Sequence, residues 1–214
     1  MAAGDRDQTG APDYSPDSSP DEQRTRLINA MTRAAAERGY ANTSVDQVAA
    51  YAGVSRETFF RHFSGADQCL VAAYDSFFER LVGHIEGACD SRDPWPVQVK
   101  AGLAATLNFF AEVPSTGRVF LVEAMSAGPA AMERRFASID RLARQLRYGR
   151  EFNPAAKSLP AATERTLVAG IGLVISVHLL AEEGPLLPTK EPELTELVLT
   201  PYLGDREAKR IAAS

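Results

Sequence analysis

Residues 44–63 read SVDQVAAYAGVSRETFFRHF, and the order of helix caps, apolar positions and glycine in this stretch dictates a definite local structure. Ser44 and Gln47 are spaced as a capping box. The Ser44 hydroxyl can accept from the Gln47 backbone N–H, and the Gln47 side chain can reach back to the Ser44 N–H. Because apolar residues then recur at helical spacing, we predict a short helix over 45–52.

A turn and a second helix follow. Gly53 can adopt the left-handed conformation that a tight turn needs, and Ser55 is a typical N-cap for a new helix. Phe59 and Phe63 lie four residues apart and form the inward stripe of a helix predicted over 56–62. Two short helices across a tight turn are the geometry of a helix-turn-helix, whose second helix enters the DNA major groove with its N-terminus first.

The exposed arc of this second helix carries groups that can bind DNA. Arg56 can donate two hydrogen bonds to guanine O6 and N7, and Thr58 can contact a thymine methyl group or a phosphate. His62 can donate to a phosphate, and the first helix can offer backbone N–H groups to another at Ser44. The alternative is a short capped helix that merely packs two phenylalanines into a core. The candidate DNA-binding residues are Ser44, Ser55, Arg56, Glu57, Thr58, Phe60, Arg61 and His62.

The chain from residue 21 onward reads as helix throughout, because apolar residues recur every three or four positions and Pro or Gly marks the breaks. No segment alternates like a strand. The expected fold class is all-α: an N-terminal three-helix helix-turn-helix domain plus a C-terminal helical bundle, about nine helices in all. Residues 1–20 are rich in Pro, Asp and Ser and are expected to form a disordered tail. The other predicted helices cover 21–38, 66–88, 94–112, 114–127, 129–149, 160–183 and 191–202.

Composition narrows the function. The chain has 214 residues, 45% of them hydrophobic, which excludes a wholly disordered protein. Its net charge of −5 gives no general basic coat, so any DNA binding must come from a local motif. No apolar run reaches the roughly 20 residues that span a bilayer, and the polar N-terminus is no secretory signal. Cys69 and Cys89 lie near opposite ends of one predicted helix, too far apart for a disulfide. We expect a cytoplasmic protein with no membrane partner.

Catalysis is not expected. The three histidines, His62, His84 and His178, are scattered over different predicted helices. The sequence has no HxxxH, CxxC or GxSxG motif, and no glycine-rich phosphate loop precedes a helix. We therefore expect no catalytic residues, no metal site and no cofactor.

Residues 39–63 resemble the DNA-binding domain of TetR-type (TetR/AcrR) transcriptional regulators. The pattern that carries the resemblance is AxxAGVSxxTFxxxF, from Ala49 to Phe63. The resemblance implies a homodimer that binds a palindromic operator in double-stranded DNA through residues 21–74. It also implies that residues 75–214 form a helical domain that dimerises and binds a small-molecule effector.

Three departures from the family pattern bear on DNA binding. Phe60 stands where the family usually has tyrosine, whose hydroxyl commonly meets a phosphate, and Ala66 stands where lysine is usual. Glu57 replaces a small residue, and it can accept from cytosine N4 or, as we favour, pair with Arg61 four residues on. Residues 21–74 hold six arginines and six acidic residues. We therefore expect few phosphate contacts, a shallow salt dependence, and reliance on base contacts or dimer avidity.

The C-terminal domain offers two further candidate surfaces. The resemblance places a ligand cavity among helices rich in large apolar side chains, although plain core packing is the alternative for each of them. The candidate pocket residues are Phe77, Leu81, Trp95, Leu103, Leu107, Phe110, Phe120 and Met125. The 160–183 segment is apolar nearly all round, and with the next helix it can form an isologous four-helix dimer interface. The candidate interface residues are Ile171, Val174, Ile175, His178, Leu194, Leu197, Val198 and Tyr202.

These inferences predict a repressor, although an activator could use the same device. The free dimer would hold the operator, and a small, mostly apolar ligand would release it through the 66–88 helix that joins the two domains. The alternative is a helical ligand-binding or protein-interaction module in which DNA binding is weakened or lost.

Overall fold

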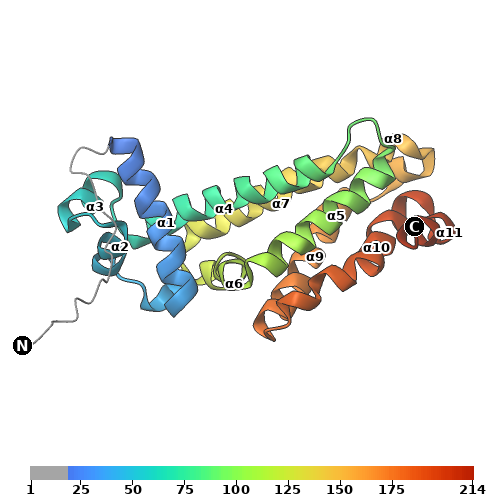
Figure 1. Cartoon of the computed structure of the whole chain (residues 1–214). Coiled ribbons are helices and arrows are strands. Elements are labelled where there is room, and N and C mark those ends of the chain that lie inside the picture. The colour runs from blue at the N-terminus through green and yellow to red at the C-terminus, as the bar shows by residue number, and fades with distance from the viewer. Residues whose placement is uncertain (1–18) are drawn as a thin grey trace, which may run out of the picture.

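The computed structural model describes residues 19–214, and every regular element in that range is a helix (Figure 1). The all-α fold class is thus confirmed. The predicted tail falls on residues 1–18, outside the described part of the chain, except for its last two residues. Ser19 begins a capping box with Glu22, and helix α1 (Pro20–Arg38) starts one residue earlier than predicted.

The helix-turn-helix forms as the sequence predicts. Helix α2 (Val45–Ala52) begins with the expected capping box. It ends at Gly53, whose φ of 65° lies in the left-handed region that favours glycine. Helix α3 (Arg56–His62) follows, and its two inward phenylalanines, Phe59 and Phe63, are buried.

The remaining elements extend to the C-terminus. A long helix, α4, leaves the N-terminal domain and runs through the C-terminal one, and short 3-10 segments join several helices. Their bounds are η1 (Tyr40–Asn42), α4 (Ala66–Ala88), α5 (Trp95–Glu112), α6 (Pro114–Leu121), η2 (Glu123–Ser126), α7 (Pro129–Arg147), α8 (Gly149–Phe152), η3 (Pro154–Ser158), α9 (Thr163–Leu180), η4 (Gly184–Lys190), α10 (Glu191–Leu203) and α11 (Asp205–Ala212).

The segment predicted as one helix over 114–127 is broken. Helix α6 ends at Leu121, because the backbone at Val122 departs from helical geometry with φ of −116°. The 3-10 segment η2 then begins at Glu123, whose carboxylate bonds to the N-terminal domain. A tertiary contact therefore accompanies the break in a pattern that is otherwise helical.

The helix predicted over 160–183 is also shorter, since α9 begins only at Thr163. The guanidinium of Arg150 accounts for the difference. It donates to the backbone carbonyls of Leu159 at 2.8 Å and Pro160 at 2.9 Å, which holds this segment against α8 instead of in the helix.

Helix α11 lies outside the predicted helices. Gly204, with φ of 77°, turns the chain after α10. Helix α11 then packs back on α10 and buries one face, formed by Ala208, Ile211 and Ala212. Because it is short and otherwise charged, its sequence gives a weak helical pattern.

Figure 1 shows an elongated molecule, with α1, α2 and α3 at one end and α8 and α11 toward the other. Helices α4 and α7 run side by side along the body, and α4 also packs on α1 and α5. The domain boundary that we expect at residue 74 falls inside α4, so one rigid helix belongs to both domains.

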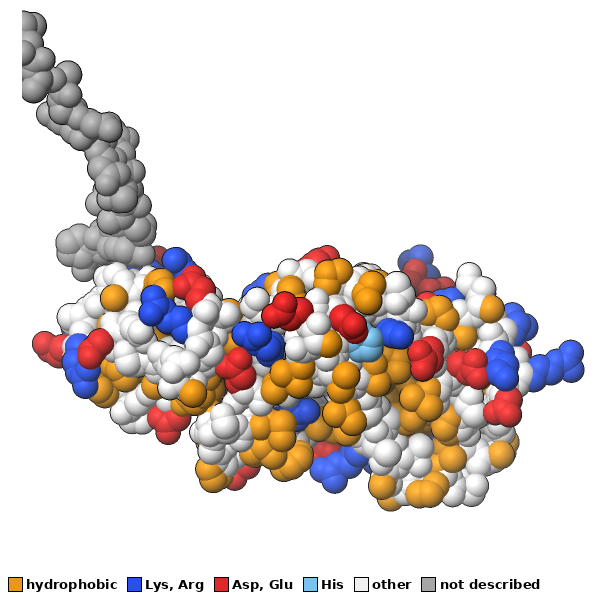
Figure 2. Space-filling model, turned by 90° about the horizontal axis from the view of Figure 1, so that it is seen from below, with side chains coloured by type: hydrophobic (Ala, Val, Ile, Leu, Met, Phe, Trp, Pro, Cys, Tyr) orange, Lys and Arg blue, Asp and Glu red, His pale blue; other side chains and the backbone are white. Residues whose placement is uncertain are grey.

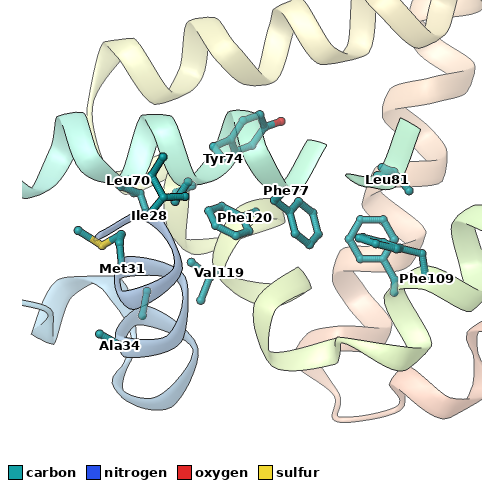
Figure 3. Close-up of a cluster of buried hydrophobic side chains, with 14 of the residues drawn as sticks. Ile28, Met31, Ala34, Leu70, Tyr74, Phe77, Leu81, Phe109, Val119 and Phe120 are labelled. Carbon is teal, nitrogen blue, oxygen red and sulfur yellow. The ribbon is translucent and has the colours of Figure 1, made fainter. Parts of the chain in front are cut away.

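A continuous hydrophobic core joins the two domains (Figure 3). Met31 of α1 and Val119 of α6 are fully buried where these helices pack together. Phe120 of α6 stacks on Phe77 of α4 with ring centroids 4.7 Å apart, and Tyr74 meets Phe120 edge-on at 5.9 Å. Such aromatic pairs stabilise the junction of α4 and α6 beyond simple area burial. Because α1 also packs on α6, the N-terminal domain is packed on the body and not merely tethered to it.

A second, smaller cluster closes the far end of the body. Trp95 meets Tyr202 edge-on at 4.9 Å, and it lies so close to Gly149 that a Cβ there would be 2.3 Å from its ring. Nearby, the fully buried Glu164 accepts two hydrogen bonds from Arg150, at 2.6 and 2.9 Å, and one from the Tyr202 hydroxyl at 3.2 Å. Burial alone would raise the pKa of Glu164, but these bonds and the arginine charge bring it below its ordinary value.

Candidate functional site

The outer face of α3 is the first candidate site. Of the predicted DNA contacts, Arg56, Glu57, Phe60 and Arg61 are exposed there. Ser55 is also exposed, and its hydroxyl caps the helix by accepting from the Thr58 N–H at 3.0 Å. The structure therefore brings most of the predicted set together at the N-terminal end of one short helix.

Thr58 does not lie on the exposed face of α3, where we predicted it. Its side chain is buried, with 8% exposed, because α2 packs on α3. Its Oγ1 lies 3.0 Å from the Ser55 hydroxyl and accepts from Arg61 Nη2 at 2.9 Å. Thr58 thus holds its two neighbours in place and is not free to touch a base or a phosphate.

The favoured ion pair between Glu57 and Arg61 is also corrected. Arg61 turns toward Thr58, and the ion pairs found over residues 19–214 do not include one with Glu57. Glu57 stays exposed at the start of α3. Its carboxylate is therefore directed to solvent, where it would lower the local positive potential.

The remaining two candidates lie at the edges of the motif. Ser44 is exposed at the start of α2, and its hydroxyl accepts from the Gln47 N–H at 3.3 Å. His62 is half-buried, and its Nε2 lies 3.3 Å from Gln23 Oε1 of α1. His62 therefore faces α1 more than it faces solvent.

Arg56 is the best-placed cation of the motif. Its Nη1 donates to Asp46 Oδ1 of α2 at 2.5 Å, and its guanidinium carbon lies 5.2 Å from the centre of the Phe60 ring. The arginine side chain remains 59% exposed. It is therefore both held and accessible, which is what a base contact requires.

The second candidate site is a cavity in the C-terminal domain. It has a volume of about 790 Å³ and lies between side chains of α4, α5, α6, α7, α8 and α9. Cavities of this size are typical of small-molecule sites. Six of the predicted pocket residues line it: Phe77, Leu81, Trp95, Leu103, Phe110 and Phe120.

The other two predicted pocket residues are corrections. Leu107 is fully buried, but it lies in the closed core and not at the cavity wall. Met125 is 47% exposed, because η2 carries it outward after the break in α6. Hydrophobicity alone could not separate a wall residue from its neighbour one turn away.

The parts of the cavity wall that α7 and α9 contribute were not predicted from the sequence. Helix α7 contributes Ile139, Leu142 and Leu146, whose spacing is a helical signal that could have found them. Helix α9 contributes Ile171 and Ile175, which we predicted for the dimer interface. The uniformly apolar sequence of α9 gave no signal for which of its faces turns inward.

The predicted dimer interface needs the same correction. Leu197 is exposed, and Val174 and His178 are half-buried. The other five candidates already fill the interior of their own chain, so they have no free face for a partner: Ile171, Ile175, Leu194, Val198 and Tyr202.

The apolar side chains that α9 does expose are different ones. Leu173, Val177 and Leu180 are 63%, 55% and 58% exposed. Their spacing of four and three residues places them on one helical face. Figure 2 shows hydrophobic side chains on the C-terminal body, with charged side chains of both signs among them. Large exposed apolar patches of this kind mark interaction surfaces.

Helix α9 has 18 residues and is apolar enough to cross a membrane, by length and composition alone. One such helix is weak support for a membrane span, because core helices of ordinary globular proteins pass the same test. No group of three or more His, Cys, Asp or Glu side chains over residues 19–214 is placed to hold a metal ion.

Both arginines at the cavity wall are engaged by the protein. Arg141 forms an ion pair with Glu79, and Arg135 donates to the backbone carbonyl of Leu121. Burial raises the pKa of Tyr74, so its phenol is neutral at physiological pH. The wall that these residues form is therefore suited to an apolar ligand body.

A polar contact links the two sites. The Glu123 carboxylate of η2 accepts from the backbone N–H of Tyr40 at 2.7 Å, and it lies 3.3 Å from Arg118 Nε. Tyr40 belongs to η1, between α1 and α2, while Phe120 and Leu121 just before η2 line the cavity. The residue of η2 that bonds to the N-terminal domain thus follows the cavity wall by two positions along the chain.

Residues 27–73 match a family described as bacterial regulatory proteins, tetR family. The chain is also 26% identical over 114 residues to the HTH-type transcriptional regulator EthR of Mycolicibacterium smegmatis. That alignment covers 53% of this chain and 52% of EthR, so the chain spans about half the length of the curated relatives it matches. The second of these relatives is the HTH-type transcriptional activator FasR of the same organism, 27% identical over 89 residues.

Solved structures share the fold over most of the chain. The fatty acid degradation regulator FadR from Bacillus halodurans has a TM-score of 0.73 and 16% identity, and the match covers 91% of this chain and 99% of FadR. FadR from Bacillus subtilis in complex with stearoyl-CoA has a TM-score of 0.68 and 16% identity, covering 84% and 98%. The match over residues 27–73 shows a tetR-family helix-turn-helix in this chain, and the solved structures share its fold over most of its length.

Proposed function

We propose that the chain is a ligand-responsive repressor that works in the cytoplasm as a homodimer on a palindromic operator. Two copies of α3 would enter successive major grooves, about one helical turn apart. A ligand of the C-terminal cavity would release the DNA. The observation that carries the proposal is the combination, in one chain, of an exposed basic α3 and a cavity of about 790 Å³.

The exposed face of α9 supports the homodimer. Leu173, Val177 and Leu180 would be costly to leave in water, at about 25 cal/mol for each Å² of apolar surface. A twofold axis would pair this face with its own copy, since an isologous contact uses the same patch twice. Leu197 of α10 is exposed as well and is the one exposed member of the interface set predicted from sequence.

The shape of the cavity supports an elongated, mostly apolar ligand. Its wall follows α4 from Tyr74 to Cys89, a distance of about 22 Å at 1.5 Å per residue. Aromatic and aliphatic side chains dominate the wall. The B. subtilis neighbour that binds stearoyl-CoA lends this ligand class further support.

The Glu123 contact supports a route between the sites. A ligand that pushes Phe120 and Leu121 would displace η2, and with it the carboxylate that holds the Tyr40 N–H. The DNA-facing domain would then shift relative to its copy. By linkage, the ligand weakens DNA binding only as far as it prefers this second arrangement.

Electrophoretic mobility shift with DNA from upstream of the protein's own gene tests the function. The wild-type chain should form a specific complex, and Arg56→Ala should lose about tenfold or more in affinity, the scale of one bidentate guanine contact. Stearoyl-CoA and a fatty alcohol of equal length would then be titrated into the complex. A chain that selects no DNA, from this region or from a random library, would favour the non-DNA-binding module instead.

A further inference from the structure

We infer that Asp46 and Phe60 are positioning residues that orient Arg56 toward one guanine and so set the base specificity of α3. The inference rests on the proposed DNA-binding function and adds to it. It assigns a role to an acidic residue that net-charge arguments would count only as a hindrance.

A polar contact joins Arg56 of α3 to Asp46 of α2. Arg56 is the first residue of α3, at the end that would enter the major groove first. Its Nη1 donates to Asp46 Oδ1, and Asp46 is the second residue of α2. Both side chains are well exposed, at 59% and 67%. The pair therefore lies on the outside of the motif and joins its two helices.

An aromatic contact also holds the Arg56 guanidinium, which lies over the ring of Phe60. Phe60 is one turn along α3 from Arg56, and its ring lies 5.2 Å from the guanidinium carbon. Phe60 in turn meets Phe59 edge-on, with ring centroids 5.5 Å apart, and Phe59 is fully buried. The support for the arginine thus reaches down to the core of the domain.

The Arg56 guanidinium keeps N–H groups free for a base while it is bound to Asp46. A guanidinium has five N–H groups in one plane, and the contact with Asp46 occupies Nη1. The edge formed by Nε and Nη2 remains available for guanine O6 and N7. Because the arginine is held before it meets DNA, less conformational freedom is lost on binding.

The acid carries an electrostatic cost that makes the inference testable. The Asp46 carboxylate would face a polyanion, so it should weaken sequence-independent binding while it sharpens base selection. An exposed ion pair with no positioning role would show the first effect without the second. The two properties should therefore move in opposite directions when Asp46 is neutralised.

The experiment starts from double-stranded DNA selected from a random library by the wild-type chain. Arg56→Ala should abolish the preference for guanine at one position of each half-site, which identifies the base that Arg56 reads. Asp46→Asn should then reduce that guanine preference about fivefold or more, while affinity for unrelated DNA stays equal or rises.

Asp67→Asn is the matched control, since it removes one exposed acid of the same domain at the start of α4. It should raise affinity for unrelated DNA and leave the guanine preference unchanged. Phe60→Leu should lower the preference, while Phe60→Tyr, which keeps the ring, should retain it. Thermal unfolding of each variant separates a folding defect from a change in specificity.

Each outcome has a distinct meaning. If the wild-type chain selects no DNA, the proposed function itself fails. If it selects DNA but folded Asp46→Asn keeps the full guanine preference, the positioning role is overturned. The same conclusion follows if Arg56→Ala changes no base preference at any position.

Discussion

The two ends of this protein differ in how they use apolar side chains. In the helix-turn-helix, residues such as Phe59 and Phe63 are all buried in one environment, the N-terminal end of the continuous hydrophobic core. In the C-terminal body, one helix sends side chains to three places. On α9, Leu179 joins the core, Ile171 and Ile175 also face the cavity, and Leu173 is exposed.

This contrast in packing matches the two proposed roles, DNA recognition by the N-terminal domain and ligand response by the C-terminal body. A closed core positions α3 rigidly, as base recognition requires. A hollow body with an exposed apolar face can accept a ligand and a second copy, and each can shift the balance between two arrangements. The five experiments below, ordered by expected effect, test whether the two ends are as different as their packing indicates.

The largest effect is expected at the buried Glu164 of the body. Glu164→Ala would leave Arg150 and the Tyr202 hydroxyl without their acceptor, at a cost of about 3–5 kcal/mol in unfolding free energy. Urea denaturation measures it. Arg165→Ala breaks the exposed pair with Asp140 instead and should cost less than about 1 kcal/mol. Equal losses for both variants would show that the buried network is not what closes this end.

The same carboxyl gives a pH dependence. Its pKa in the folded chain lies below its ordinary value of 4.5, so the unfolded chain binds the proton more readily. Its contribution to stability is therefore present above pH 4.5 and is lost as the pH falls through the lowered folded pKa. Urea midpoints between pH 7 and pH 3 should fall more steeply for wild type than for Glu164→Gln.

The exposed face of α9 should give the next largest effect. Val177→Asp would place a charge in the proposed interface and raise the dimer dissociation constant about 30-fold or more, equivalent to about 2 kcal/mol. Sedimentation velocity measures the association state. Val97→Asp, which changes an exposed apolar residue at the far end of α5, is the control and should leave it unchanged. A monomeric wild type would remove the dimer proposal altogether.

The junction between the two ends should respond to Glu123. Glu123→Ala removes the acceptor of the Tyr40 N–H, and hydrogen exchange at that amide should become about tenfold faster, the scale of one charged hydrogen bond. Glu133→Ala, at an exposed position of α7, serves as the control. An unchanged exchange rate in Glu123→Ala would mean that this contact does not hold η1 in solution.

The smallest effect is expected from filling the cavity. Gly102→Leu would place a side chain at the cavity wall, where its Cβ makes ordinary contacts with Ile85 and Cys89. Gly87→Leu has open space around it on the same body. Both should raise stability by about 1 kcal/mol through helix propensity. Binding of the neutral dye Nile red should fall about tenfold in Gly102→Leu alone.

Local sequence signals were sufficient to predict the helix-turn-helix of the N-terminal domain. The capping box at Ser44, the turn at Gly53 and the N-cap at Ser55 predict α2 and α3 with the bounds that the structure has. Each of these signals acts over three or four residues, through hydrogen bonds that the chain makes with itself. The exception is Thr58, whose burial depends on how α2 packs across α3.

In the C-terminal body, local sequence signals do not predict the environment of each side chain. Most of its helices could be predicted from periodicity, but the environment of a side chain such as Ile175 or Met125 could not. An apolar residue is equally stabilised by a core, a ligand or a partner, because the hydrophobic effect has no direction. The break in α6 is likewise accompanied by a hydrogen bond from Tyr40 to Glu123, two residues that lie 83 positions apart in the chain.

The caps, the turn and the helix bounds of the helix-turn-helix therefore follow from neighbouring residues alone, since the interactions that create them are short in sequence. The cavity, the exposed face of α9 and the link at Glu123 arise only when distant helices meet. At that stage packing assigns each apolar side chain to the interior, the cavity or the surface, and geometry, not hydrophobicity, makes the choice.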